Sequence, residues 1–184
     1  MPALYQPSLL RALHGSTAVV TGLCWLSGAA IYNHFDGRWG RLPLPLPVDI
    51  DLHGSLGLAL LALTLPFGAY ALSLGRARLN RAANAAPLLA LALCLASGLA
   101  MEGEWLEHGD FQHLAYQLHL LAWLLIGVMV VWHSLALLRR GGPALAVSIW
   151  QPGLRAGDGP LQWPQQVKRF FGFRSSSGPQ GPSD

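Results

Sequence analysis

Two histidines, His119 and His133, bracket an uncharged apolar run that includes two tryptophans. On an α-helix, fourteen residues correspond to a rise of about 21 Å and nearly four turns, so both imidazoles project from roughly the same face. Ionisable side chains are costly inside a membrane and usually have a function there. Two histidines at two levels of one helix therefore predict two sites, one above the other, completed by residues from other helices.

The composition indicates a membrane protein. Of its 184 residues, 52% are hydrophobic and only 11% are charged, whereas a soluble domain has about 25% charged residues. The length suits one domain. The net charge of +3 does not indicate nucleic-acid binding, because the basic residues form short clusters beside apolar runs, as topology signals do.

Apolar runs predict an all-α fold, an integral membrane four-helix bundle with up-down-up-down topology. Each of four runs can cross a bilayer, at about residues 9–32, 50–74, 86–101 and 111–138. No A-x-A cleavage site follows the first run, so it is interpreted as a retained helix. The bundle domain is expected over residues 1–142. A tail rich in Gly, Pro and Ser follows over 143–184 and is expected to be cytoplasmic and partly disordered.

Basic residues predict the orientation of the bundle. Three segments of the chain lie on the same side of the predicted bundle, and each contains arginine. They contribute Arg11, then Arg76, Arg78 and Arg81, and then Arg139 and Arg140. This side is expected to be cytoplasmic, which places both termini there. Aromatic and basic residues mix around Trp163 and Lys168 in the tail. That mixture fits a segment on an anionic membrane surface and a segment that docks a partner equally well.

The predicted topology gives each histidine a depth. His14 and His133 lie just inside the basic, cytoplasmic edge, while His53 and His119 lie near the opposite edge. We therefore expect two pairs, His14 with His133 and His53 with His119, at depths about 20 Å apart. The cores of membrane bundles hold cofactors between side chains of facing helices.

Paired imidazoles at two depths favour haem over other metal chemistry. Two axial histidines close a haem iron to substrate and leave it to carry electrons. Zinc requires three or four clustered ligands, and a proton relay would favour acids or lysines within the spans, which have none. Cys24 and Cys94 form no C-x-x-C-H motif, so the haems are expected to be non-covalent and the thiols to act as small hydrophobes. His34, His108 and His113 do not fit either pair.

The pattern resembles the four-helix di-haem membrane cytochromes b. This group includes formate dehydrogenase gamma subunits, nickel-hydrogenase cytochrome b subunits and bacterial cytochrome b561. The resemblance covers about residues 8–140 and rests on Leu13-His14-Gly15, on His53-Gly54 thirty-nine residues after His14, and on the pair His119 and His133. It implies two non-covalent b haems, with all four histidines as iron ligands. It also implies electron exchange with membrane quinone, in a bacterial-type inner (plasma) membrane or a thylakoid.

Two classes of function follow. The first is transmembrane electron transfer through two bis-histidine haems, either as a free-standing oxidoreductase or as a subunit that anchors a redox partner. The expected contacts are then membrane lipid, quinone and, for an anchoring subunit, a redox partner subunit, and no nucleic acid. The second is a haem-free scaffold or anchor subunit of a larger complex. A transporter is disfavoured because no span is polar enough and no inverted repeat is visible.

Overall fold

The computed structural model describes residues 5–42, 45, 47–102 and 110–170. The long helices are α1 (Ser8–Phe35), α2 (Ile50–Leu72), α4 (Ala82–Glu102) and α5 (Asp110–Val147), and the short elements are α3 (Arg76–Leu79), η2 (Ser148–Trp150), η3 (Pro160–Gln162) and α6 (Trp163–Phe170). The described part contains no strand. Four of its helices are long and apolar enough to cross a membrane. The predicted all-α, four-helix membrane fold is confirmed.

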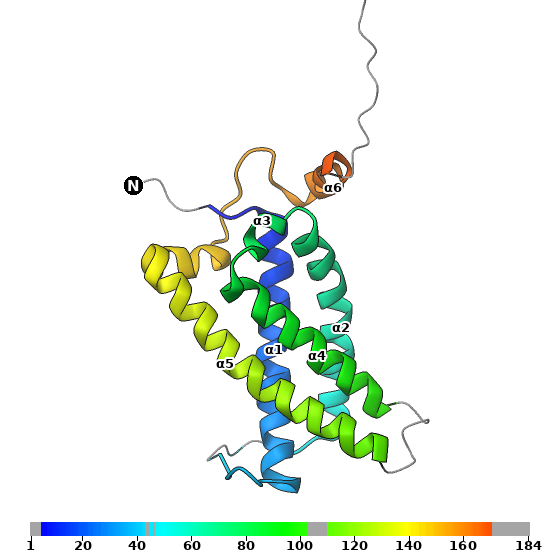
Figure 1. The fold of residues 1–184 in the computed structure, drawn as a ribbon. Helices are drawn as coiled ribbons and strands as arrows, with labels where there is room; N and C mark the ends of the chain where they lie inside the picture. Colours follow the sequence, from blue (N-terminus) through cyan, green and yellow to red (C-terminus); the bar gives the residue numbers. More distant parts are fainter. Residues whose placement is uncertain (1–4, 43–44, 46, 103–109, 171–184) are drawn as a thin grey trace, which may run out of the picture.

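The long helices form two pairs. α1 packs mainly against α2, and α4 packs mainly against α5, while the contacts between the two pairs are sparse (Figure 1). In the middle of the bundle a small apolar cluster joins them, built from Leu60 of α2, Ala90 and Leu91 of α4 and Ile126 of α5. The seam between the pairs therefore runs along the bundle with little protein contact.

The outside of the bundle is apolar. Val19, Leu65, Leu89 and Val131, one from each long helix, have 51%, 65%, 70% and 59% of their surface exposed. Such large exposed apolar area is typical of a surface that contacts lipid tails. The chain is therefore an integral membrane protein.

Local hydrogen bonds fix where the first two helices end and begin. The backbone N–H groups of Asp36 and Gly37 both donate to the carbonyl of Tyr32, which closes α1. Gly37 has a φ of 65°, a conformation that glycine adopts without strain. α2 begins where the Asp49 carboxylate accepts a hydrogen bond of 2.8 Å from the N–H of Leu52.

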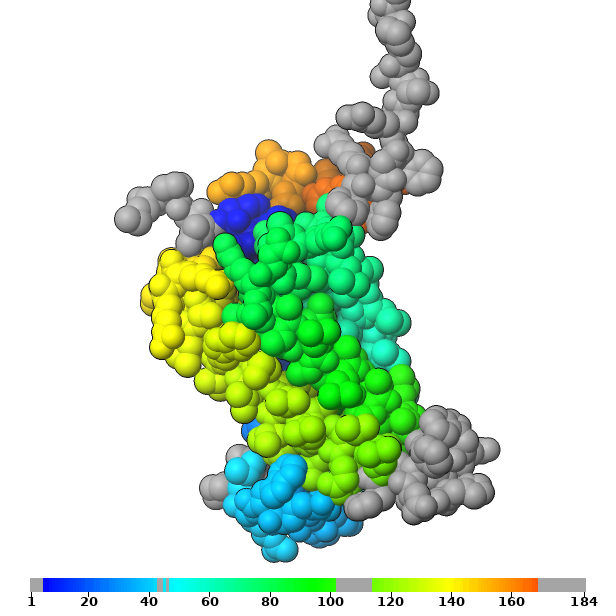
Figure 2. All heavy atoms as spheres, in the orientation of Figure 1, coloured from blue at the N-terminus to red at the C-terminus, as the bar shows by residue number. Residues whose placement is uncertain are grey.

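The two ends of the bundle differ. We call the end where α1 begins the terminal end, and the end with the 36–49 connection the loop end. At the terminal end α5 bends at Gly142, whose φ of 64° and ψ of −165° require glycine, and the tail turns back over the bundle. There Asp158 accepts a hydrogen bond of 2.8 Å from the N–H of Ser8, and the Trp163 indole donates to the Ser8 hydroxyl. Figure 2 shows the tail packed over the start of α1.

Candidate functional site

At the terminal end, the structure brings His14 of α1 and His133 of α5 together. Their ring centroids are 6.2 Å apart and their planes are inclined by 33°. His133 Nδ1 lies 2.9 Å from the carbonyl oxygen of Ala83. His14 packs against the edge of Phe67, and its Nδ1 is buried without a hydrogen-bond partner in the described part of the chain.

At the loop end, His53 of α2 and His119 of α5 form the second pair. Their ring centroids are also 6.2 Å apart, but the planes are nearly perpendicular, at 86°. His53 Nδ1 is 2.8 Å from the Ser27 hydroxyl, and His119 Nδ1 is 3.0 Å from the Cys94 carbonyl oxygen and 3.2 Å from the Ser97 hydroxyl. Both rings are thus held from the side of Nδ1.

The hydrogen bonds at Nδ1 determine which tautomer is present. A carbonyl oxygen can only accept, so Nδ1 of His119 and of His133 must carry the proton. The Ser27 hydroxyl donates to the Cys24 carbonyl, which leaves the Ser27 oxygen to accept from His53 Nδ1. In each of these three rings the neutral form keeps its lone pair on Nε2, the nitrogen free to bind a metal.

Glycines allow helix backbones to approach the loop-end rings closely. A Cβ on Gly28 of α1 would lie 3.3 Å from Cε1 of His53, and a Cβ on Gly98 of α4 would lie 3.2 Å from Cε1 of His119. Both distances are tighter than ordinary contact. Any side chain at these positions would therefore push the imidazole aside, so α1 and α4 form a tight cradle around this pair.

An aromatic column runs between α1 and α5 toward the loop end. Trp25 of α1 and Trp123 of α5 stack with centroids 5.1 Å apart, and each indole N–H donates to the other residue's carbonyl, at 3.1 and 3.0 Å. Tyr32 stacks on Trp123 at 5.6 Å and is followed by Trp39 at the loop end. The reciprocal bonds fix α1 against α5 across the sparse seam.

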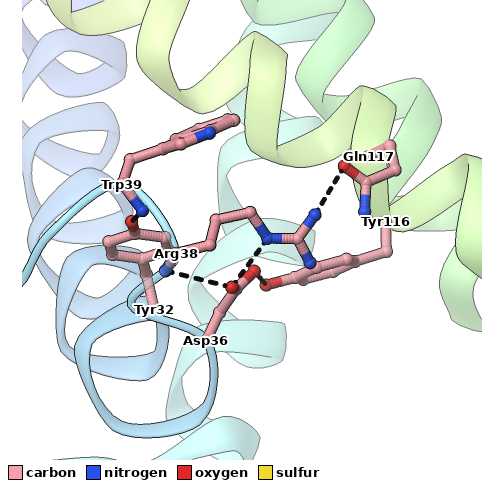
Figure 3. A network of polar contacts seen from close by, with 6 residues as sticks. All are labelled: Tyr32, Asp36, Arg38, Trp39, Tyr116 and Gln117. Carbon is pink, nitrogen blue, oxygen red and sulfur yellow. Dashed lines mark hydrogen bonds and ion pairs between the residues drawn. The ribbon is translucent and has the colours of Figure 1, made fainter.

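Beyond the His53–His119 pair, at the end of the bundle, polar side chains form a hydrogen-bonded network (Figure 3). Arg38 Nε donates to Asp36 at 2.7 Å and Arg38 Nη1 donates to Gln117 at 3.0 Å, while the Tyr116 hydroxyl donates to the other Asp36 oxygen at 2.6 Å. The hydrogen bond from Arg38 is the main reason that the pKa of Asp36 is lowered. The network thus ties the 36–42 loop to α5 one turn before His119.

The geometry of both pairs fits a bis-histidine haem. An imidazole nitrogen binds a metal at about 2 Å, so two rings on opposite sides of one metal have centroids about 6 Å apart. Both pairs have this spacing, and three of the four rings have their Nδ1 bonded as a ligating histidine requires. No group of three or more His, Cys, Asp or Glu that could hold a metal ion occurs among the described residues, which disfavours zinc.

The remaining candidates lie elsewhere. His34 is exposed in the last turn of α1, His108 falls outside the described residues, and of His113 only the backbone is described, within α5. Cys24 and Cys94 are unbridged thiols that pack beside the central apolar cluster.

Sequence reasoning missed the groups that orient the rings. Ser27 lies in α1 at the level of His53, and Ser97 and the carbonyls of Ala83 and Cys94 belong to α4. A serine inside each apolar run was the available signal. The two backbone carbonyls gave no signal, because every residue has a carbonyl.

Comparison with known proteins gives one match. A family model described as "Prokaryotic cytochrome b561" matches residues 5–146, well over half of the chain. No curated protein and no solved structure matches. The matched segment contains all four paired histidines.

Proposed function

Because the chain belongs to the prokaryotic cytochrome b561 family, we propose that it holds two non-covalent b haems, one between His14 and His133 and one between His53 and His119. Membership in this family of haem b cytochromes indicates transmembrane electron transfer by haem. The observation that carries the finer proposal is the spacing of the two pairs. Both have ring centroids at 6.2 Å, on different helices and at two levels of one bundle.

In this proposal the chain holds the two haems in position and limits their iron to electron transfer. When bound, haem iron supplies one-electron redox chemistry. The two histidines of each pair would hold the haem iron between them, which would leave no place for a substrate to bind it directly. Hydrogen bonds at Nδ1 hold the rings of His53, His119 and His133 in the metal-binding tautomer. The apolar cluster packs the two helix pairs together, and the aromatic column packs α1 against α5.

The charge of the two ends indicates how the protein is oriented in the membrane. The terminal end has arginines in α3 and near the end of α5, beside the start of α1, so we propose that it faces the cytoplasm with both termini. Membrane quinone would exchange electrons beside the terminal-end haem. A soluble donor or a partner subunit would act at the other haem. Either a plasma membrane or a thylakoid could contain the protein.

A pyridine haemochrome assay on detergent-purified protein tests the proposal. We expect two b haems per chain. His119→Ala and His133→Ala should each reduce this to one, because each removes one axial ligand of a different haem. His34→Ala is the matched control, since His34 is exposed and outside both pairs, and it should retain both haems.

The results that contradict the proposal are equally clear. A colourless protein would favour a haem-free scaffold. A count of two haems in His119→Ala or His133→Ala would show that these residues are not ligands. Simultaneous loss of both haems in each variant, with intact folding by circular dichroism, would contradict two separately ligated sites.

A further inference from the structure

A groove of about 460 Å³ opens on the outer side of α1 at the terminal end. Its walls include Arg11, Ser16 and Val19 of α1, and Trp150 and Gln151 of the tail. We propose that this groove binds the phosphate headgroup and the upper acyl chains of an anionic phospholipid. The inference goes beyond the proposed electron transfer and does not depend on it.

Among the residues that the structure describes, Arg11 has no acidic partner. Arg11 is only 8% exposed, and its guanidinium donates to the carbonyls of Gln151 and Gly153 and lies 5.0 Å from the centre of the Tyr5 ring. Its Nε is buried without a hydrogen bond, and no carboxylate among the described residues pairs with it. Neutral carbonyls satisfy hydrogen bonds but leave a positive charge, which in a partly buried site favours an anion nearby.

The carboxylate of Asp158, which also lies at this end, is already hydrogen-bonded to other groups. Asp158 accepts hydrogen bonds from Tyr5, from Ser8 and, at 3.2 Å, from Gln166, so its oxygens face the start of α1 rather than the groove. By contrast, the side-chain amide of Gln151 makes no hydrogen bond with any described residue although it lines the groove. A positively charged residue and a residue with a side-chain amide therefore both line the groove.

The groove faces lipid rather than the proposed haem. Ala12, Ser16 and Val19 follow the i, i+4, i+7 spacing and share one face of α1, whereas His14 is two residues from both Ala12 and Ser16, about 200° around the helix. Val19 and Trp150 are 51% and 55% exposed, so they present apolar surface to the bilayer. A tryptophan beside an arginine is typical of the membrane–water interface.

These features select one ligand class. A zwitterionic lipid would bring its own positive group and leave the Arg11 charge uncompensated. Free phosphate would leave the apolar wall formed by Val19, Ile149 and Trp150 unfilled. An anionic phospholipid offers both an acceptor for Arg11 and acyl chains for the wall, and binding would also hold the tail against α1.

Native mass spectrometry of the delipidated full chain tests the proposal, with titration by phosphatidylglycerol, phosphatidylcholine or inorganic phosphate. We expect one phosphatidylglycerol to bind about tenfold more tightly than phosphatidylcholine, because a charge-assisted hydrogen bond is gained. Arg11→Met should abolish this preference. Since Arg11 also anchors the tail, Ser16→Phe provides a second variant, which fills the groove and leaves the charge in place. It should also lose the bound lipid.

The matched control is Arg140→Gln, which removes an exposed charge at the same end but away from the groove, and it should bind lipid as the unaltered protein does. Equal phosphatidylglycerol affinity in Arg11→Met and the unaltered chain would overturn the proposal. So would unchanged binding in Ser16→Phe, equal binding of phosphatidylcholine, or phosphate binding as tightly as the lipid. A haemochrome assay of each variant shows separately whether haem is retained.

Discussion

The two histidine pairs have the same ring separation, but different parts of the molecule hold them. At the loop end, Ser27 and Ser97 are hydrogen-bonded to the rings, Gly28 and Gly98 let helix backbones touch them, and the aromatic column packs beside them. At the terminal end only His133 has an Nδ1 partner, a backbone carbonyl.

At the terminal end, the tail adds contacts to the start of α1. It covers the start of α1, where Asp158 and Trp163 bond to Ser8 and where Trp150 lies 3.5 Å from the position of a Cβ on Gly15, next to His14. The loop-end pair is thus held by residues within the helices, whereas at the terminal end the start of α1 is also held by a segment about 150 residues later in the sequence. The two sites should therefore respond to different substitutions.

Of the substitutions proposed here, Gly98→Leu should affect the two histidine pairs most differently. A leucine side chain cannot fit where a Cβ alone would be 3.2 Å from the His119 ring, so the ring must move and the loop-end haem should be lost. The haemochrome count should fall from two to one. Gly22→Leu is the control, because a Cβ there meets nothing within 4 Å, and it should keep both haems. A full haem count in Gly98→Leu would show that the cradle is not needed.

A smaller effect is expected from Ser27→Ala, which removes the Nδ1 partner of His53. Loss of such an outer hydrogen bond typically weakens metal affinity by about tenfold to a hundredfold. Transfer of haem to an apo-globin scavenger should therefore become faster for one of the two haems. Ser134→Ala, which removes a hydroxyl that bonds only to its own helix, should leave both transfer rates unchanged.

A weaker change is expected at the terminal end from Asp158→Asn. The carboxylate caps α1, whose preceding residue, Pro7, supplies no side-chain cap, and loss of a cap costs about 1 kcal/mol. Hydrogen exchange of the first turn of α1 should become faster, and the tail should be cleaved more readily by protease. Asp51→Asn, at the other end of the bundle, should change neither; equal protection in Asp158→Asn would show that the tail does not need this acid.

The same contact predicts a pH dependence. Burial alone would raise the pKa of Asp158, but hydrogen bonds from Tyr5, Ser8 and Gln166 outweigh it and lower the pKa below the ordinary 3.8. A lowered pKa in the folded state stabilises docking above the unfolded value and ceases to do so as the pH falls through the folded one. Tail protection should therefore be constant from about pH 5 to 8 and decline only below pH 4, as exchange measured across this range would show.

The smallest expected difference between the two proposed haem sites is in their electron paramagnetic resonance signals. If each pair holds a haem as proposed, rings inclined by 33° would interact mainly with one iron d orbital, whereas rings at 86° would interact with two orbitals about equally and leave them nearly degenerate. Electron paramagnetic resonance of the oxidised protein should therefore show two low-spin signals, the loop-end one more anisotropic. In Gly98→Leu the more anisotropic signal should disappear. Its survival there would reverse the assignment of the two signals.

Much of the fold could be predicted because membrane helices have strong local signals. Apolar runs gave the four spans, and basic segments beside them gave histidine depths that pair as the structure pairs them. The fourth span was expected to stop at the Arg139–Pro143 segment, and the backbone does leave the helical conformation there, at Gly142. The further helical segment from this kink to Val147 was not predicted.

What could not be predicted depends on contacts between distant segments. Nothing periodic in the tail indicates that Asp158 caps α1, or that Arg11, expected as a topology signal, is buried under tail carbonyls. The exchanged hydrogen bonds of Trp25 and Trp123 are likewise invisible, because a tryptophan in an apolar run is usually simple packing. Sequence gives the depth of a residue but not its rotation about the helix toward one particular neighbour.

The sparse seam between the α1–α2 and α4–α5 pairs has a consequence for biogenesis. Most helix packing lies within each hairpin, whereas the proposed haems would bridge the hairpins through histidines from both. Haem supply in the cell would then decide when two hairpins become one unit. Chains made during haem shortage should remain loosely joined and be the first that membrane proteases remove.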